Sequence, residues 1–176
     1  MLKSVASAVS LSSLISTSAM ALNVEIPMLV RETEEIATLS NLDPRPADLS
    51  IQGAELAIAD NTTTGKFLGH QYSLKIHNLS VDGDLADVAL SILADHQIII
   101  TDLPSEDLLQ IADLPEAANA LIINATAEDS ALRDGACRAN VLHTAPSLAM
   151  RTDALMQYFL FKRWGKLAMI EGQTSR

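Results

Sequence analysis

Apolar runs and helical segments alternate along this chain, and that alternation restricts its fold more than any other feature. Residues 24–30, 98–101, 120–124 and 166–171 are almost continuously apolar, which is typical of strands covered on both faces. Residues 70–79 alternate between apolar and polar side chains, so we expect this strand nearer an edge. With helical segments between the strands, the order predicts an α/β fold, a parallel sheet with helices on both faces.

Apolar side chains three and four residues apart mark the helices. The clearest helix lies within residues 82–96, with Asp84 as its N-cap and an apolar face made by Leu85, Val88, Ala89, Ile92 and Leu93. A shorter helix is expected at 105–113. A longer one within 146–165 begins at Ser147, stops at Gly165 and carries Leu148, Thr152, Leu155, Met156 and Phe159 on one side.

A further helix is predicted within residues 46–61. One side of it would carry Leu49, Gly53, Leu56 and Ala57. Because Gly and Ala are small, we expect this side to lie close against the sheet.

The first 21 residues have the pattern of a secretory signal peptide. Lys3 provides the positive start, residues 5–15 are apolar and small, and Ala19-Met20-Ala21 is an A-x-A cleavage site. The apolar part is too short to span a bilayer, so a soluble periplasmic protein without membrane insertion is expected. The remaining chain has 11 basic and 22 acidic residues, a balance that argues against nucleic acid as a partner.

Catalytic and metal-binding patterns are not found in the sequence. It has no Gly-rich phosphate loop, G-x-S-x-G, H-E-x-x-H or C-x-x-C, and its four histidines lack metal-ligand spacing. We therefore expect no enzyme, no cofactor and no metal. Asp102 closes a strand as a response-regulator phosphoacceptor does, but its companion groups cannot be placed. The single Cys137 is a reactive thiol, a site of pairing with another chain or, as is commonest, a small buried hydrophobe.

Polar residues follow two successive strands. Thr101 and Asp102 end one strand just before a helix, and Asn124, Ala125 and Thr126 end the next. Hydroxyls and free backbone N–H groups at such points can hold a carboxylate or another small polar group. The same residue types are also ordinary turn and cap residues, so the residues alone favour a structural role over a binding site.

Two stretches, IQGAELAIADNTTTGKFLGHQYSL and CRANVLHTAPSLAMRTDALMQYFLFKRWGKLAMIEG, resemble type I periplasmic binding proteins of the leucine/isoleucine/valine-binding kind. The chain is most similar to one branch of that family. That branch holds the substrate-binding proteins of ABC transporters found with pyrroloquinoline-quinone-dependent alcohol dehydrogenase systems. The resemblance extends over essentially the whole chain after the signal peptide.

The resemblance implies a protein of two α/β lobes. Residues 22–145 would form the first lobe, and residues 146–176 the opening helix and strand of a second lobe that is otherwise absent, as in a C-terminally truncated product. A helix and strand alone cannot bury their apolar faces, so Met156, Trp164 and Met169, with Phe159, are expected to be partly exposed.

The family's first-lobe ligand contacts map onto Thr101, Asp102, Ala125 and Thr126. The function implied is a periplasmic solute receptor that closes on a small polar solute and delivers it to the membrane subunits of an ABC importer. An acid at position 102 would repel a carboxylate, so an alcohol or a cationic group is favoured over an amino acid. Two alternatives stay open: a ligand-sensing regulatory domain of the same fold, and a small flavodoxin-like enzyme.

Overall fold

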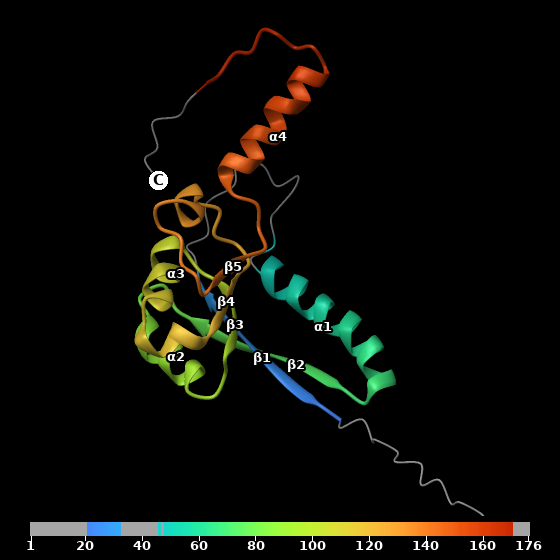
Figure 1. The fold of residues 1–176 in the computed structure, drawn as a ribbon, viewed down its shortest axis with the longest axis vertical. Helices are drawn as coiled ribbons and strands as arrows, with labels where there is room; N and C mark the ends of the chain where they lie inside the picture. The colour runs from blue at the N-terminus through green and yellow to red at the C-terminus, as the bar shows by residue number, and fades with distance from the viewer. Residues whose placement is uncertain (1–20, 33–45, 47, 171–176) are drawn as a thin grey trace, which may run out of the picture.

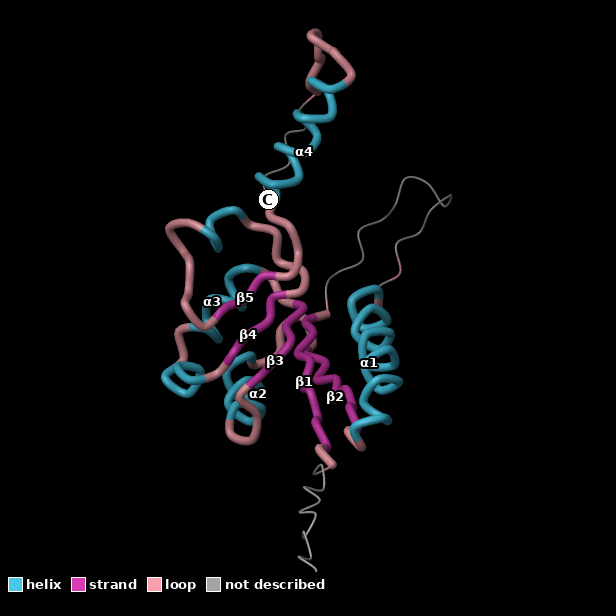
Figure 2. The backbone as a smooth tube through the Cα atoms, turned by 45° about the vertical axis from the view of Figure 1, so that its right-hand side comes forward, coloured by secondary structure: helices cyan, strands magenta, loops and turns pink. Residues whose placement is uncertain are grey.

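A parallel sheet of five strands forms the centre of the molecule. The computed structural model describes residues 21–32, 46 and 48–170, so the predicted signal peptide, apart from Ala21, lies outside the described residues. The strands, drawn in magenta in Figure 2, are β1 (Asn23–Arg31), β2 (Gln71–Leu79), β3 (Ile98–Asp102), β4 (Leu121–Asn124) and β5 (Val141–His143). The predicted α/β class and parallel sheet are confirmed.

The helices are α1 (Leu49–Leu68), α2 (Leu85–Leu93), α3 (Ser105–Ala112) and α4 (Leu148–Phe161), with short 3₁₀ helices η1 (Pro115–Asn119) and η2 (Ser130–Arg133). Helix α1 lies on one face of the sheet and α2 and α3 lie on the other, whereas α4 points away from it (Figure 1). The strand order is β2-β1-β3-β4-β5, so β2 is an edge strand, as its alternating sequence predicted. The chain first crosses outward through α1 to β2, and then returns through α2 to β3 on the other side of β1.

The core lies between the sheet and the helices α2 and α3. The predicted face of α2 is confirmed: Leu85, Ala89 and Ile92 are buried, while Val88 and Leu93 pack against the core. They meet the buried strand residues Leu29, Ile99 and Ile122. Asp84 is the predicted N-cap, and its side chain accepts the backbone N–H groups of Ala86 and Asp87.

The face of α1 predicted to meet the sheet is wrong. Leu49 and Leu56 are 50% and 64% exposed, and the Cβ of an alanine at Gly53 would meet no atom within 4 Å. The helix also extends to Leu68, beyond the predicted end at residue 61. The less exposed residues fall on another side of the helix, namely Ser50, Ile51, Ala54, Ile58, Thr62 and Gly65. Small and apolar residues occur all round α1, so their spacing did not single out one face.

The close approach of α1 to the sheet is made at Gly65, the one fully buried residue of that helix. A Cβ there would lie 2.8 Å from Tyr72 Cε2 and 3.0 Å from the His70 carbonyl oxygen. The chain then turns at Gly69, whose φ of 73° is a left-handed conformation that glycine adopts without strain.

The predicted cover on both faces is wrong for β3 and β4, and β5, which was not predicted, is also open on one face. On the face that carries Tyr72 and Gly65, α1 packs against β2, and no helix of the described residues lies over β3, β4 and β5 (Figure 2). Ile98 is 47%, Leu121 38% and Leu142 52% exposed. A helix is about 10 Å wide and strands are about 4.8 Å apart, so α1 alone cannot cover a sheet of five strands.

The segment after β5 leaves the body of the molecule. Ser147 caps α4 as predicted, but the helix ends at Phe161 and the turn follows at Arg163, not at Gly165. The predicted strand at 166–171 is wrong for residues 166–170, which form no strand and are exposed. An apolar run becomes a strand only where a neighbouring strand accepts its backbone hydrogen bonds. Met156, Trp164 and Met169 are largely exposed, as expected.

Candidate functional site

The carboxyl ends of β1 and β3 lie side by side where the chain changes its direction of winding. In open α/β sheets, ligands bind in the crevice outside the strands at such a switch point. Val30 and Asp102 are direct neighbours across this pair of strands. The residues that follow them form one wall of a crevice of about 340 Å³, which is lined by Arg31, Asp102, Leu103, Pro104, Ser105, Thr126, Ala127 and Asp129.

Asp102 is the centre of a polar cluster in this crevice. Thr126 Oγ1 donates a hydrogen bond to Asp102 Oδ1 at 2.6 Å, and Ser50 Oγ donates to Asp102 Oδ2. Three separate segments therefore meet at one carboxylate: the first turn of α1, the end of β3 and the loop after β4. Both partners are neutral hydroxyls, so the negative charge of Asp102 is hydrogen-bonded but is not neutralised by either of them.

The loop after β4 is held by Asn124, which is completely buried. Its Oδ1 accepts the backbone N–H groups of Thr126 at 3.2 Å and Ala127 at 2.9 Å. Its Nδ2 donates to the Ala127 carbonyl at 2.8 Å and to His143 Nδ1 at 2.9 Å. Four hydrogen bonds from one side chain fix the turn that presents Thr126 to Asp102. Asn124 therefore has a structural role beneath the crevice.

The structure brings together two of the four predicted ligand-binding residues. Asp102 and Thr126 line the crevice and contact each other. Thr101 is completely buried, and its hydroxyl donates to the Ile123 carbonyl at 3.3 Å. The Ala125 N–H donates to the Thr101 carbonyl at 3.0 Å, which ties the ends of β3 and β4 together. Thr101 and Ala125 thus belong to the scaffold of the crevice.

The charges around the crevice are mainly negative. Asp102 and Asp129 both line it, and Arg31 is the one cation among the described residues of its lining. The Arg31 guanidinium is paired with Asp107 and also donates to the carbonyls of Ser80 and Val81. Arg31 is therefore already satisfied, which leaves hydrogen-bond acceptors as the main polar groups that a bound molecule would meet.

Ser50, Arg31 and Asp129 were missed by the sequence analysis. Ser50 and Asp102 are 52 residues apart, and Arg31 and Asp107 are 76 apart. The spacing of residues along the chain does not predict such contacts, because they depend on the order of the strands. Only the strand order could have indicated them: if β1 and β3 are neighbours, residues at the end of β1 lie near the residues that follow β3.

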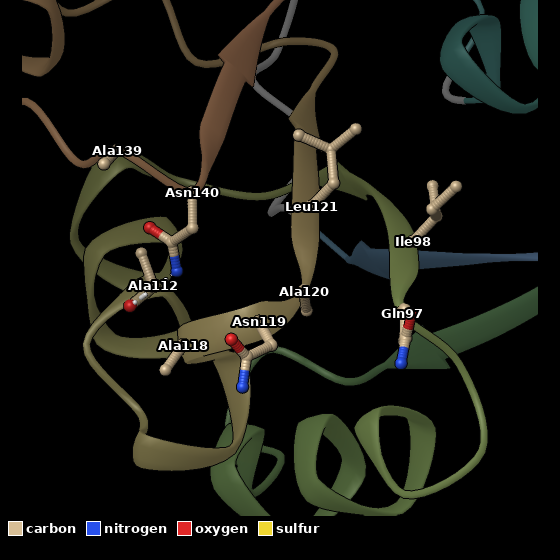
Figure 3. A pocket seen from close by; sticks show the side chains of 9 residues that line it. All are labelled: Gln97, Ile98, Ala112, Ala118, Asn119, Ala120, Leu121, Ala139 and Asn140. Carbon is tan, nitrogen blue, oxygen red and sulfur yellow. Dashed lines mark hydrogen bonds between the residues drawn. The ribbon is translucent and has the colours of Figure 1, made fainter.

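A larger hollow of about 680 Å³ lies at the opposite end of the strands (Figure 3). Its lining comes from the amino ends of β3 and β4 and from the residues before β5, namely Gln97, Ile98, Ala112, Ala118, Asn119, Ala120, Leu121, Ala139 and Asn140. The side-chain amide of Asn140 donates to the carbonyls of Ala112 and Ala117 and so closes the end of α3. None of the described residues that line this hollow is charged, and none of the predicted site residues is among them.

No protein-family model and no curated protein sequence matches this chain. Its function is therefore inferred from its residues and their geometry. Within the described residues, no helix has the length and apolar character needed to cross a bilayer. In the same part of the chain, His, Cys, Asp and Glu side chains do not gather in threes as a metal site requires. Cys137 is exposed, so the expectation that it is a buried hydrophobe is wrong.

Proposed function

We propose that this chain is the solute-binding component of an ABC importer in the periplasm and binds a small polar solute at the Asp102 crevice. Three observations support the proposal: the resemblance to type I periplasmic binding proteins, the strand order that creates a switch point, and the polar cluster at that point. The observation that carries most weight is the Asp102 carboxylate, shared by Ser50 and Thr126 from two other segments.

The solute is a hydroxylated or cationic molecule. Asp102 and Asp129 would repel a carboxylate, whereas a hydroxyl or an ammonium group can donate to either one. Thr126 and Ser50 carry hydroxyls that both donate and accept, so they can turn from Asp102 to the solute when it binds. Alcohols and amines related to alcohol metabolism therefore fit the crevice better than amino acids that present their carboxylate.

Binding at this site is tested by thermal unfolding of the purified chain with a panel of polyols, amines and amino acids. A solute that binds only the folded chain, at a concentration of about 100 times its dissociation constant, raises the free energy of unfolding by about 2.7 kcal/mol. We expect Asp102→Asn to weaken that solute's binding at least about tenfold, because the charge of this half-buried acceptor is lost. Asp82→Asn is the matched control, because it removes an exposed carboxylate outside the crevice.

Thr126 gives a second, sharper comparison. Thr126→Val keeps the shape and removes the hydroxyl, while Thr126→Ser keeps the hydroxyl. The valine variant should lose affinity for the solute found in the panel, and the serine variant should keep most of it. Unchanged affinity in both Asp102→Asn and Thr126→Val would reject the crevice as the binding site. The import role is tested separately by uptake of the same solute in cells with and without this chain.

A further inference from the structure

The helix α4 and the segment after it form an apolar extension that the other described residues do not cover; we call residues 148–170 the extension. No residue of α4 is buried. Its exposed apolar side chains point in all directions around the helix, and the largest are Leu148, Met150, Leu155, Met156, Tyr158, Leu160 and Phe161. A helix that is apolar on every side is normally enclosed by other protein surface.

The second uncovered surface is the open half of the sheet, which we call the open face: Ile98, Ile100, Leu121, Ile123 and Leu142. Ile98 and Leu121 are direct neighbours on β3 and β4, as Figure 3 shows, and Leu142 follows on β5. Three strands about 4.8 Å apart span about 10 Å, which is the width of one helix. The helix of the extension and the open face are therefore both apolar and are similar in width.

The extension does not fold back onto the open face of its own chain. Its first turn is fastened to the loop after β4, since the Leu148 N–H donates to the Glu128 carbonyl at 2.8 Å and the Ala149 N–H to Ser130 Oγ at 3.1 Å. Arg151 is also ion-paired with Glu128. With this end held, α4 points away from the sheet (Figures 1 and 2). The α4 helix of the same chain therefore does not cover its open face.

The charges of the extension and of the rest of the chain indicate which molecule covers the extension. Residues 146–170 contain four basic residues and one acidic residue, whereas residues 22–145 contain 6 basic and 20 acidic ones. Two extensions would repel each other if they paired, but an extension and the body of another copy attract. The same acidic body is repelled by anionic lipid, which disfavours a membrane surface as the partner of the extension.

We propose that two copies of this chain associate by exchanging extensions, so that α4 of each copy lies on the open face of the other. A reciprocal exchange has twofold symmetry, closes on itself and covers both apolar surfaces at once. It leaves the Asp102 crevice at the carboxyl ends of β1 and β3 in place. The proposal does not depend on the solute-binding function.

Sedimentation of the purified chain at up to about 100 µM tests the exchange. The unmodified chain should be a dimer. Leu155→Glu with Met156→Glu in α4, and Leu121→Lys with Leu142→Lys on the open face, should each weaken the dimer at least about tenfold. Phe67→Glu is the control, because Phe67 is a 91% exposed apolar residue on helix α1, and it should leave the dimer unchanged.

Mixing the two disabled chains is the decisive step. The α4 variant keeps an intact open face, and the open-face variant keeps an intact α4, so together they form one complete contact and should associate. Circular dichroism of each variant checks that both remain folded. A monomeric unmodified chain, a dimer that survives the α4 changes, or no association in the mixture would overturn the exchange. Capture of a monomeric chain by phosphatidylglycerol vesicles would assign the extension to lipid instead.

Discussion

At the scale of single residues, the loop after β4 depends on Asn124, a polar side chain with no exposed surface. Its four hydrogen bonds connect the turn, the Ala127 backbone and His143. This use of the side chain explains why a residue that looked like a candidate ligand contact belongs instead to the supporting structure.

Replacing Asn124 by alanine should therefore be costly. We expect Asn124→Ala to lower the free energy of unfolding by about 2–3 kcal/mol, because buried donors and acceptors lose their partners. Urea unfolding measures the change. Asn119→Ala, at an exposed position, should stay within about 0.5 kcal/mol of the unmodified chain. Equal effects of the two substitutions would mean that the Asn124 contacts do not stabilise the loop.

His143 makes the same region sensitive to pH. Burial lowers the pKa of His143 below its ordinary value of 6.5, the nearby Arg133 charge lowers it further, and the Leu132 backbone opposes the shift. Burial also lowers the pKa of His77, helped by Lys75 and His96. Below about pH 6.5 the unfolded chain then binds more protons than the folded chain, so stability must fall as the pH falls through this window.

Urea unfolding at a series of pH values tests this sign. The free energy of unfolding should be highest above about pH 7 and decrease toward pH 5.5. His143→Gln should show a smaller decrease, with the remainder due to His77. An NMR titration that gave His143 a pKa above 6.5 would contradict the role assigned to its burial.

At the scale of elements, the features that depend on residues close together in the sequence were predicted correctly. The face of α2 and the N-caps Asp84 and Ser147 were correct, because a cap and an amphipathic stripe involve residues within a few positions of each other. The edge position of β2 also followed from its alternating pattern. The contacts of Ser50 and Arg31 could not be predicted, because their partners are brought near only by the strand order.

Helix α1 and residues 166–170 are two places where the pattern of apolar residues did not predict the structure. Alanine and glycine occur around the whole of α1, so the predicted face was no more apolar than the face that meets the sheet. Residues 166–170 have the composition of a buried strand but no strand beside them. The missed β5 has only three residues, too few to show a period of its own.

The two glycines of α1 give a matched test of its orientation. Gly65→Ala should lower the free energy of unfolding by about 1 kcal/mol, because the new Cβ would press on Tyr72 and on the His70 carbonyl. Gly53→Ala should instead raise it by about 0.5–1 kcal/mol, since that position is open and alanine favours helix. Thermal or urea unfolding compares them. The opposite order would place the other side of α1 against the sheet.

At the scale of the whole molecule, the strand order determines where the polar crevice lies. The order β2-β1-β3-β4-β5 separates the chain after β1 from the chain after β3, and the space so formed holds Asp102. Within the described residues, the same order leaves one half of the sheet without a helix on its open face. The proposed solute site and the proposed assembly surface therefore lie on different parts of the same sheet.

The most direct test of the account is an NMR map of solute binding. Backbone amide signals of the purified chain are followed while the solute found in the thermal panel is added. We predict shifts confined to the crevice, at Asp102, Leu103, Thr126, Ala127 and Asp129, and their loss in Asp102→Asn. Chemical-shift changes at the hollow near the amino ends of β3 and β4, or changes that persist in Asp102→Asn, would contradict the proposal that this carboxylate holds the solute.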